Sequence, residues 1–321
     1  SQRPTNTRQQ KNWGIFFICC NFKIKKGERV MKTNKQKTNK QALLNHKVLC
    51  SLLAAGFFCS WGAAAPVYAA VATQKVVNSD LAGGLETNSE SVKVTGGSRI
   101  TGTVKVINDA NYQTGAHGSA FSIQTEGPVI FDGDGDVEIR TYNDDSYAHT
   151  NAIKLHNDGA SLLVDKAGHS VTLALDAAGG QSTKYDEVAG IYLTNNNQNV
   201  VINADNVNFE NNGYNRGYGI WTGASAVDSI ITINGNANFS DDAAAKEAYA
   251  IRHDHGTTVI NGNTKITMVG AGGSGIRAIN GAVQFNGDTV IDLKGDVAYI
   301  DRNVPAFGIW NGATPYGVTP I

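Results

Sequence analysis

The chain contains four cysteines, and all of them lie within its first 59 residues, at Cys19, Cys20, Cys50 and Cys59. The remainder therefore cannot form a disulfide and must be stabilised by a hydrophobic core and by backbone hydrogen bonds. Basic residues are scarce there too, because residues 71–321 have 15 Lys and Arg against 27 Asp and Glu, whereas residues 1–70 have 12 against one. The acidic part is unsuited to nucleic acid, which needs a basic surface to neutralise its phosphates.

The apolar stretch Val48–Phe58, about eleven residues long, is too short to span a bilayer. A basic region that begins at Met31 precedes it, and small residues follow it, ending in Val67-Tyr68-Ala69. This order is typical of a bacterial signal peptide over residues 31–69, cleaved after that tripeptide or, as second choice, after Ala72. A retained membrane anchor is the alternative.

Residues 1–30 begin with Ser, and the segment Lys25–Val30 can be encoded by a purine-rich tract of the kind that recruits bacterial ribosomes. We interpret residues 1–30 as an upstream segment that is translated by mistake and is disordered. A real helix over the apolar patch Trp13–Cys20 is the alternative interpretation.

Short apolar stretches recur after residue 70, separated by Asn, Asp and Gly. Each repeat begins with a marker, a small residue followed by an apolar one, at Ala120-Phe121, Ala152-Ile153, Gly190-Ile191, Gly219-Ile220, Ala250-Ile251, Gly275-Ile276 and Gly308-Ile309. Successive markers are 25 to 38 residues apart. Second stretches centre on Val129/Phe131, Leu163, Val200/Ile202, Ile231/Ile233, Val259 and Val283/Phe285. Third stretches centre on Val137/Ile139, Val171/Leu173, Val207/Phe209, Phe239, Ile266/Met268 and Ile291/Leu293.

Three such stretches cannot satisfy their backbone groups inside one repeat, but stacked repeats can. Each strand then pairs in parallel with its counterpart in the next repeat, and the inward side chains form one continuous core. The sequence therefore predicts an all-β fold, a right-handed single-stranded parallel β-helix (a solenoid) with three short strands per rung. The Asn, Asp and Gly clusters predict tight corners, because these residues tolerate a left-handed backbone. We expect most length variation between a third stretch and the next marker, and helix only near Ala243–Glu247.

The chain divides into four predicted segments. Residues 1–30 are the upstream segment, 31–69 the signal peptide, 70–118 an N-terminal leader with capping rungs around Val92/Val94 and Val104/Val106, and 119–321 the β-helix repeats. A cap is expected at this end because an exposed ladder invites aggregation. Since Ile321 falls inside a repeat, we interpret the β-helix as truncated at its C-terminal end.

Taken together, the signal at residues 31–69, the Gly- and Asn-rich strand repeats and the cysteine-free acidic part resemble the N-terminal part of autotransporter proteins, which are bacterial surface proteins. The resemblance covers residues 31–321 and implies an exported adhesin-like passenger at the cell surface, the outer membrane or outside the cell. It also implies a C-terminal outer-membrane β-barrel as a partner, which is missing from this sequence.

Motifs that carry catalysis or bind metal are weak. His253 and His255 have no third ligand tied to them by spacing, and Asp132-Gly133-Asp134-Gly135-Asp136 has Val137 where a calcium loop of the EF-hand type needs Gly. No serine nucleophile elbow or phosphate loop is present. We therefore predict no metal, no cofactor and no catalytic residue.

The residue after each marker must point outward if the marker points into the core. These residues form a predicted ligand-binding strip of exposed aromatic and basic side chains, which begins at Ser122 and continues through Lys154, Tyr192, Trp221, Arg252, Arg277 and Trp310. Rings stack on sugars and cations bind acidic glycans, so we expect adhesion to a host or neighbouring cell surface or to glycans. The residues could instead simply cover the sheet. The alternative function is a secreted polysaccharide lyase or glycosidase, with Asp144 and Asp145, or Arg252 beside Asp254, as its charged groups.

Overall fold

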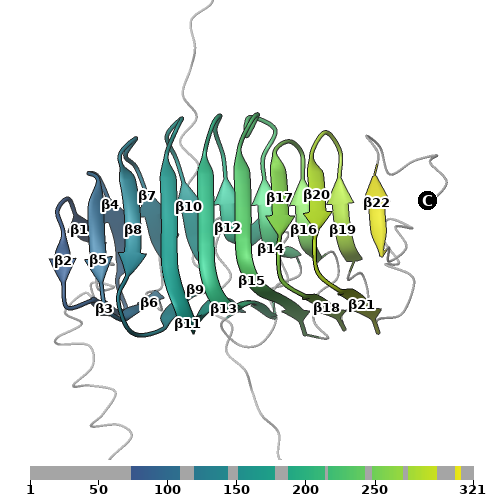
Figure 1. Cartoon of the computed structure of the whole chain (residues 1–321), viewed down its shortest axis with the longest axis horizontal. Coiled ribbons are helices and arrows are strands. Elements are labelled where there is room, and N and C mark those ends of the chain that lie inside the picture. Colours follow the sequence, from purple (N-terminus) through teal and green to yellow (C-terminus); the bar gives the residue numbers. More distant parts are fainter. Residues whose placement is uncertain are drawn as a thin grey trace, which may run out of the picture. The chain divides into compact units, whose positions relative to one another are not determined.

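The computed structural model describes residues 74–108, 119–143, 151–177, 187–213, 216–242, 248–269, 274–294 and 308–311. In these residues the regular elements are all β-strands, as predicted (Figure 1). This part of the chain contains no helix that could cross a membrane. The predicted segments 1–30 and 31–69 lie outside the described residues, as do Asp144, Asp145 and the helix expected near Ala243–Glu247.

One sheet contains nine strands within the described residues. Their spatial order is β1 (Gln74–Val77), β4 (Ser91–Val94), β7 (Phe121–Ile123), β10 (Ile153–Leu155), β12 (Glu187–Leu193), β14 (Arg216–Thr222), β16 (Tyr249–His253), β19 (Ser274–Ala278) and β22 (Ile309–Asn311). Neighbours in this order are parallel, although they are separated in the sequence by the strands of the other sheet.

The other sheet contains thirteen strands within the described residues. Its main path is β2 (Leu81–Ala82), β5 (Ser98–Thr101), β8 (Pro128–Asp132), β11 (Ser161–Ala177), β13 (Asn199–Asn212), β15 (Ile230–Asp241), β17 (Thr257–Ile260) and β20 (Ala282–Phe285). Five more strands pair beside this path: β3 (Leu85–Asn88), β6 (Val104–Asn108), β9 (Val137–Asn143), β18 (Thr264–Met268) and β21 (Thr289–Leu293). All of these pairings are parallel as well.

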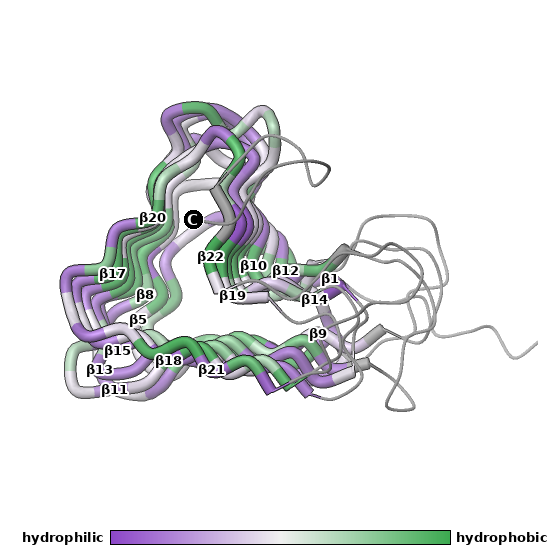
Figure 2. The backbone as a smooth tube through the Cα atoms, turned by 90° about the vertical axis from the view of Figure 1, so that its right-hand side faces the viewer, coloured by the Kyte–Doolittle hydropathy of each residue, from purple (hydrophilic) through white to green (hydrophobic). Residues whose placement is uncertain are grey.

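The markers lie in register across the nine-stranded sheet. Their apolar residues form one unbroken column of paired positions, Phe121, Ile153, Ile191, Ile220, Ile251, Ile276 and Ile309. Viewed along the stack (Figure 2), equivalent strands of successive repeats superimpose. The column extends upstream to Val92, which pairs with Phe121, so the segment expected to cap the repeats continues the same register.

The division into second and third strands differs from the prediction in three repeats. β11, β13 and β15 each continue from the second stretch into the third, with register shifts between Lys166 and Ser170 and between Asn203 and Asn206. Ladder hydrogen bonding therefore continues through these corners, and an irregularity rather than a break turns the chain.

Two predicted strand centres point away from the core. Leu163 and Val259 are half-buried, whereas their neighbours Leu162, Thr258 and Ile260 are buried. The interior register is set by the preceding repeat, which pairs Ile231 with Thr258. In the stretch around Val259, the apolar and polar alternation did not indicate which side chains point inward, because the inward position 258 is a threonine.

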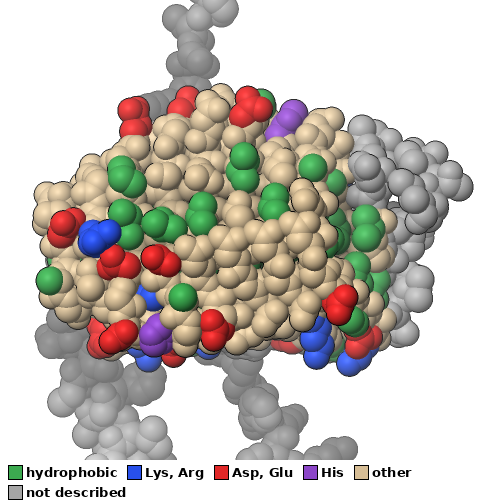
Figure 3. Space-filling model, viewed as in Figure 1, with side chains coloured by type: hydrophobic (Ala, Val, Ile, Leu, Met, Phe, Trp, Pro, Cys, Tyr) green, Lys and Arg blue, Asp and Glu red, His purple; other side chains and the backbone are tan. Residues whose placement is uncertain are grey.

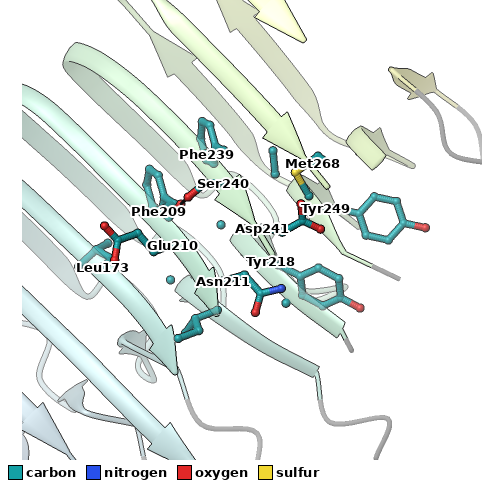
Figure 4. Close-up of a pocket in the computed structure, with 15 residues that line it drawn as sticks. Leu173, Phe209, Glu210, Asn211, Tyr218, Phe239, Ser240, Asp241, Tyr249 and Met268 are labelled. Atoms are coloured by element: carbon teal, nitrogen blue, oxygen red, sulfur yellow. Dashed lines mark hydrogen bonds between the residues drawn. The ribbon is translucent and has the colours of Figure 1, made fainter. Parts of the chain in front are cut away.

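Small residues at the markers make room for large side chains of the other sheet. A Cβ atom added to Gly190 would lie 2.8 Å from Cδ1 of Phe209 and 2.7 Å from the carbonyl oxygen of Gly219. Gly219 faces Phe239 in the same way. The two phenylalanine rings stack with centroids 4.6 Å apart (Figure 4). Gly190 and Gly219 thus make room for the phenylalanine rings of the other sheet, whereas the marker glycine Gly275 lies against Ile291 and the backbone of Gly308.

The corners use the left-handed backbone that the sequence predicts. In the first corner of three successive repeats, Asn197, Asp228 and Gly256 have φ values of 55°, 56° and 83°. Ser89 also has a positive φ, of 68°, which the prediction did not include. Asn and Asp adopt this conformation more readily than other side chains, and Gly adopts it without steric cost.

Asparagine side chains connect the corners of successive repeats. Nδ2 of Asn234 donates to Oδ1 of Asn203 at 2.7 Å, Asn261 donates to Asn234 at 2.5 Å, and Asn286 donates to Asn261 at 2.6 Å. Each amide both donates and accepts, so the ladder stabilises the stack along its length.

Replacing Gly190 with Ala is expected to lower the free energy of unfolding by about 1–3 kcal/mol, because the new methyl group would overlap the Phe209 ring and a backbone oxygen. Chemical denaturation measures the change. Gly97→Ala is the matched control, since its Cβ would lie 3.5 Å from the nearest atom, an ordinary contact. Equal stability of the two variants would contradict the packing role of Gly190.

Candidate functional site

The predicted strip residues lie in one column on the nine-stranded sheet. We call it the outer-face column, and it consists of Lys154, Tyr192, Trp221, Arg252, Arg277 and Trp310, each of which pairs with the next. Ser122 pairs with Lys154 at one end. The side chain of Trp310, at the other end, lies outside the described residues.

Rings and cations contact one another along the outer-face column from Lys154 to Arg252. The rings of Tyr192 and Trp221 stack with centroids 4.1 Å apart and planes 12° apart. Nζ of Lys154 lies 5.4 Å from the centre of the Tyr192 ring, and Cζ of Arg252 lies 5.0 Å from that of Trp221. These distances suit cation–π attraction, so the column is bound together by its own side chains.

A second row of aromatic residues, which sequence reasoning missed, lies beside the column. Tyr218 and Tyr249 form one cluster with Trp221. Regular alternation would place Tyr218 and Trp221 on opposite faces because they are three residues apart, so the alternation is interrupted between them, where Gly219 lies. Tyr218 pairs with Tyr249 one repeat later, and this register could have been predicted from the marker.

Arg252 and Asp254 link the two rows. Nη1 of Arg252 donates to the hydroxyl of Tyr218 at 2.9 Å, and Nη2 donates to Oδ2 of Asp254 at 3.4 Å. The indole nitrogen of Trp221 donates to the same carboxylate oxygen at 3.3 Å. Arg277 lies over the ring of Tyr249 one strand further, with its Cζ 5.9 Å from the ring centre.

The expectation that the whole strip is exposed was wrong. Trp221 is only 7% exposed and Ser122 5%, while Lys154, Tyr192 and Arg252 are half-buried. Trp221 is covered by its column neighbours Tyr192 and Arg252 and by Tyr218 of the second row. Burial lowers the pKa of Lys154 because it penalises the charged form.

A second charged cluster, also missed at the sequence level, surrounds Arg140 on the thirteen-stranded sheet. Its guanidinium contacts Glu138 at 2.6 Å, Asp176 at 3.3 Å and Glu210 at 3.4 Å, and Lys105 lies 3.2 Å from Glu138. The hydrogen bond from Arg140 is the main cause that lowers the pKa of Glu138. The network ties together side chains from four successive repeats.

The aspartate-rich corner considered for calcium binds an ammonium group instead. Nζ of Lys166 donates to the carbonyl oxygens of Gly102, Asp132 and Gly133 at 2.6, 2.8 and 3.0 Å. Lys166 is only 1% exposed, and burial lowers its pKa. Three carbonyl oxygens from two stacked corners therefore converge on one ammonium group.

His253 and His255 do not form a metal pair. His253 is buried, and Thr222 lies between it and His255: the Thr222 hydroxyl donates its single hydrogen to the carbonyl oxygen of His255. Nδ1 of His253, 2.5 Å from the same hydroxyl oxygen, must therefore be the donor in that pair. Burial lowers the pKa of His253 to about 4. Among the described residues no group of three or more His, Cys, Asp and Glu could hold a metal ion.

Searches of protein-family models, of curated proteins and of solved structures found no match to this chain. What it does must therefore be argued from its own residues.

Replacing Lys166 with Met is expected to lower the free energy of unfolding by about 1–3 kcal/mol, because it removes the buried ammonium group that donates to three carbonyl oxygens. Thermal or chemical unfolding measures the loss. Lys265→Met is the control, since Lys265 is exposed and its replacement should change stability by less than about 0.5 kcal/mol. If both variants unfold alike, the hydrogen bonds from Lys166 to the three carbonyl oxygens do not stabilise the fold.

The burial of His253 should make the stability of the fold sensitive to acid. Its pKa is about 4 in the folded state against 6.5 in a free side chain, so the unfolded chain binds more protons between these values. Stability contributed by neutral His253 is complete above pH 6.5 and falls by about 3 kcal/mol as the pH drops to 4. Denaturation of the wild type and of His253→Gln across this window should show a smaller pH dependence in the variant.

His255→Gln is the control for this measurement, because His255 is half-buried and its side chain is not the one in the core. It should keep the wild-type pH dependence. An unchanged slope in His253→Gln would show that His253 does not couple folding to protonation.

Proposed function

We propose that the described strands belong to a right-handed single-stranded parallel β-helix with three strands per rung. Three parallel ladders support this: the marker strands, the second strands and the third strands, each paired one repeat apart. The right-handed sense follows from the general preference of parallel crossover connections. Stacking uses the strand edges of each rung, so the outer faces of the sheets and the corners stay accessible to partners.

On this fold we propose a secreted surface passenger of the autotransporter type, which acts in adhesion to cells or in interaction with glycans. The signal segment 31–69 would export it, and the acidic, cysteine-free remainder is suited to crossing an envelope without disulfides. The proposed place of action is the cell surface, the outer membrane or the medium.

The observation that carries this role is the outer-face column. It gathers three cations and two aromatic rings of the described side chains on one face, whereas residues 71–321 as a whole are acidic. Lys154, Tyr192 and Arg277 are half-buried rather than buried, so part of each reaches solvent. Amphipathic rings beside cations suit sugars, and above all acidic ones.

The alternative role, a polysaccharide lyase or glycosidase, finds its best support in the carboxylates around Arg140. A glycosidase of the common type needs a carboxylic acid with a raised pKa beside a second, ionised carboxylate. Arg140 instead lowers the pKa of Glu138 and pairs with Asp176 and Glu210. The cluster therefore favours structural ion pairing over acid catalysis.

Adherence of coated beads tests the proposed role. Beads that carry the protein should bind to cells or to immobilised acidic glycans, and the double variant Lys154→Gln, Arg277→Gln should reduce binding several-fold. Both changes remove a cation and leave the Tyr192–Trp221 stack in place.

The matched control removes one lysine and one arginine elsewhere, Lys265→Gln with Arg99→Gln, and should adhere like the wild type. Unfolding curves for every variant separate lost binding from lost folding. Absence of binding by the wild type, or equal losses in both double variants, counts against the proposal, and release of reducing ends from a polysaccharide favours the enzyme.

A further inference from the structure

The first corner of one repeat is longer than the corners that follow it. Seven residues, 223–229, join β14 to β15, but only three join β16 to β17 (254–256) and β19 to β20 (279–281). The long corner therefore projects beyond the two short corners that follow it in the stack and forms a ledge. This difference in corner length lies outside the segments between third stretches and markers, where most length variation was expected.

A groove of about 440 Å³ lies under the ledge, which we call the corner groove. It is lined by residues of the long corner and of both short ones, among them Val227, Asp228, Ile230, His255, Asn280 and Ala282. Its volume falls within the range of about 300–1,000 Å³ that is typical of small-molecule sites. It shares no residue with the outer-face column.

The walls of the groove are both apolar and polar. Val227 is 42% exposed and Ile230 43%, so both present apolar surface to the groove. Asp228 and Asn280 are exposed as well, and His255 is half-buried. A carboxylate accepts two hydrogen bonds from adjacent donors, and a carboxamide both donates and accepts. Neighbouring hydroxyl groups on a rigid ring match such a set.

The charge of the groove selects against an acidic ligand. None of the ten residues that line it is Lys or Arg, and Asp228 would repel a second carboxylate. Figure 3 shows this face of the thirteen-stranded sheet, with Lys and Arg at its left and lower margins and acidic and histidine side chains along its upper edge.

We infer that the corner groove binds a neutral hexopyranose unit. The carboxylate of Asp228 and the amide of Asn280 bind its hydroxyl groups, and Val227 and Ile230 contact its C–H surface. His255 supplies a further hydrogen-bonding group on the short corner that lies between these two corners. The site adds a neutral-sugar specificity to a chain whose outer-face column is cationic.

Nuclear magnetic resonance titration of the full chain tests the site. The probes are methyl α-mannoside, methyl β-galactoside and N-acetylglucosamine, with sialic acid and glucuronic acid as acidic counterparts. At least one neutral sugar should shift the amide signals of Gly256, Thr257 and Ala282, and the acidic sugars should not. Asp228→Asn should weaken that binding about tenfold, because it removes a hydrogen bond to a charged acceptor.

Asp228→Asn keeps the fold in place, since Asn197 has the same left-handed backbone one repeat earlier. Asp134→Asn is the matched control, an exposed corner aspartate that does not line the groove, and should bind like the wild type. Shifts located elsewhere, no shifts with any neutral sugar, or equal binding by Asp228→Asn would overturn the site. Bead adherence is measured separately. Sugar binding in the groove without adherence of the wild-type beads would refute the adhesive role alone. Adherence of the beads without sugar binding in the groove would refute the groove alone.

Discussion

Parallel backbone pairing between successive repeats is the constraint on which the rest of the structure depends. A strand such as β10 has only three residues and can satisfy its amides only through β7 and β12, which lie one repeat before and after it. The pairing fixes the register, and a slip of one residue would turn every core side chain outward. Ile153 therefore lies between Phe121 and Ile191, and both the core and the outer-face column follow from that register.

Stacking at strand spacing also makes equivalent side chains each other's neighbours. The asparagine ladder, the Phe209–Phe239 stack and the Tyr192–Trp221 stack are three results of the same geometry. A periodic column seen in a sequence is therefore ambiguous, because residues that could bind a ligand can equally bind one another. In this chain the cations of the column contact the aromatic rings of the same column, so these internal contacts compete with the binding of a ligand.

The parallel architecture, the marker register and the membership of the column could be predicted from the sequence, because they depend only on the period of two within a strand and on the repeat. Burial could not be predicted this way. Trp221 is covered by Tyr218 and Tyr192, and Lys166 bonds to carbonyl groups of residues more than thirty positions earlier. Such contacts depend on how side chains of different repeats meet, on which a single stretch carries no information. The signal peptide and the adhesive role remain predictions.

Equivalent side chains of regular repeats contact one another and leave few groups for a ligand. A ligand can therefore make most new contacts where neighbouring repeats differ. The outer-face column runs through equivalent strands, and its groups already have partners along the stack. The corner groove arises where a seven-residue corner is followed by corners of three, so residues of the long corner such as Val227 have no counterpart in the short corners. Irregular length, rather than repeated residue type, is thus the sequence feature that best marks open binding surface in a stacked fold of this kind.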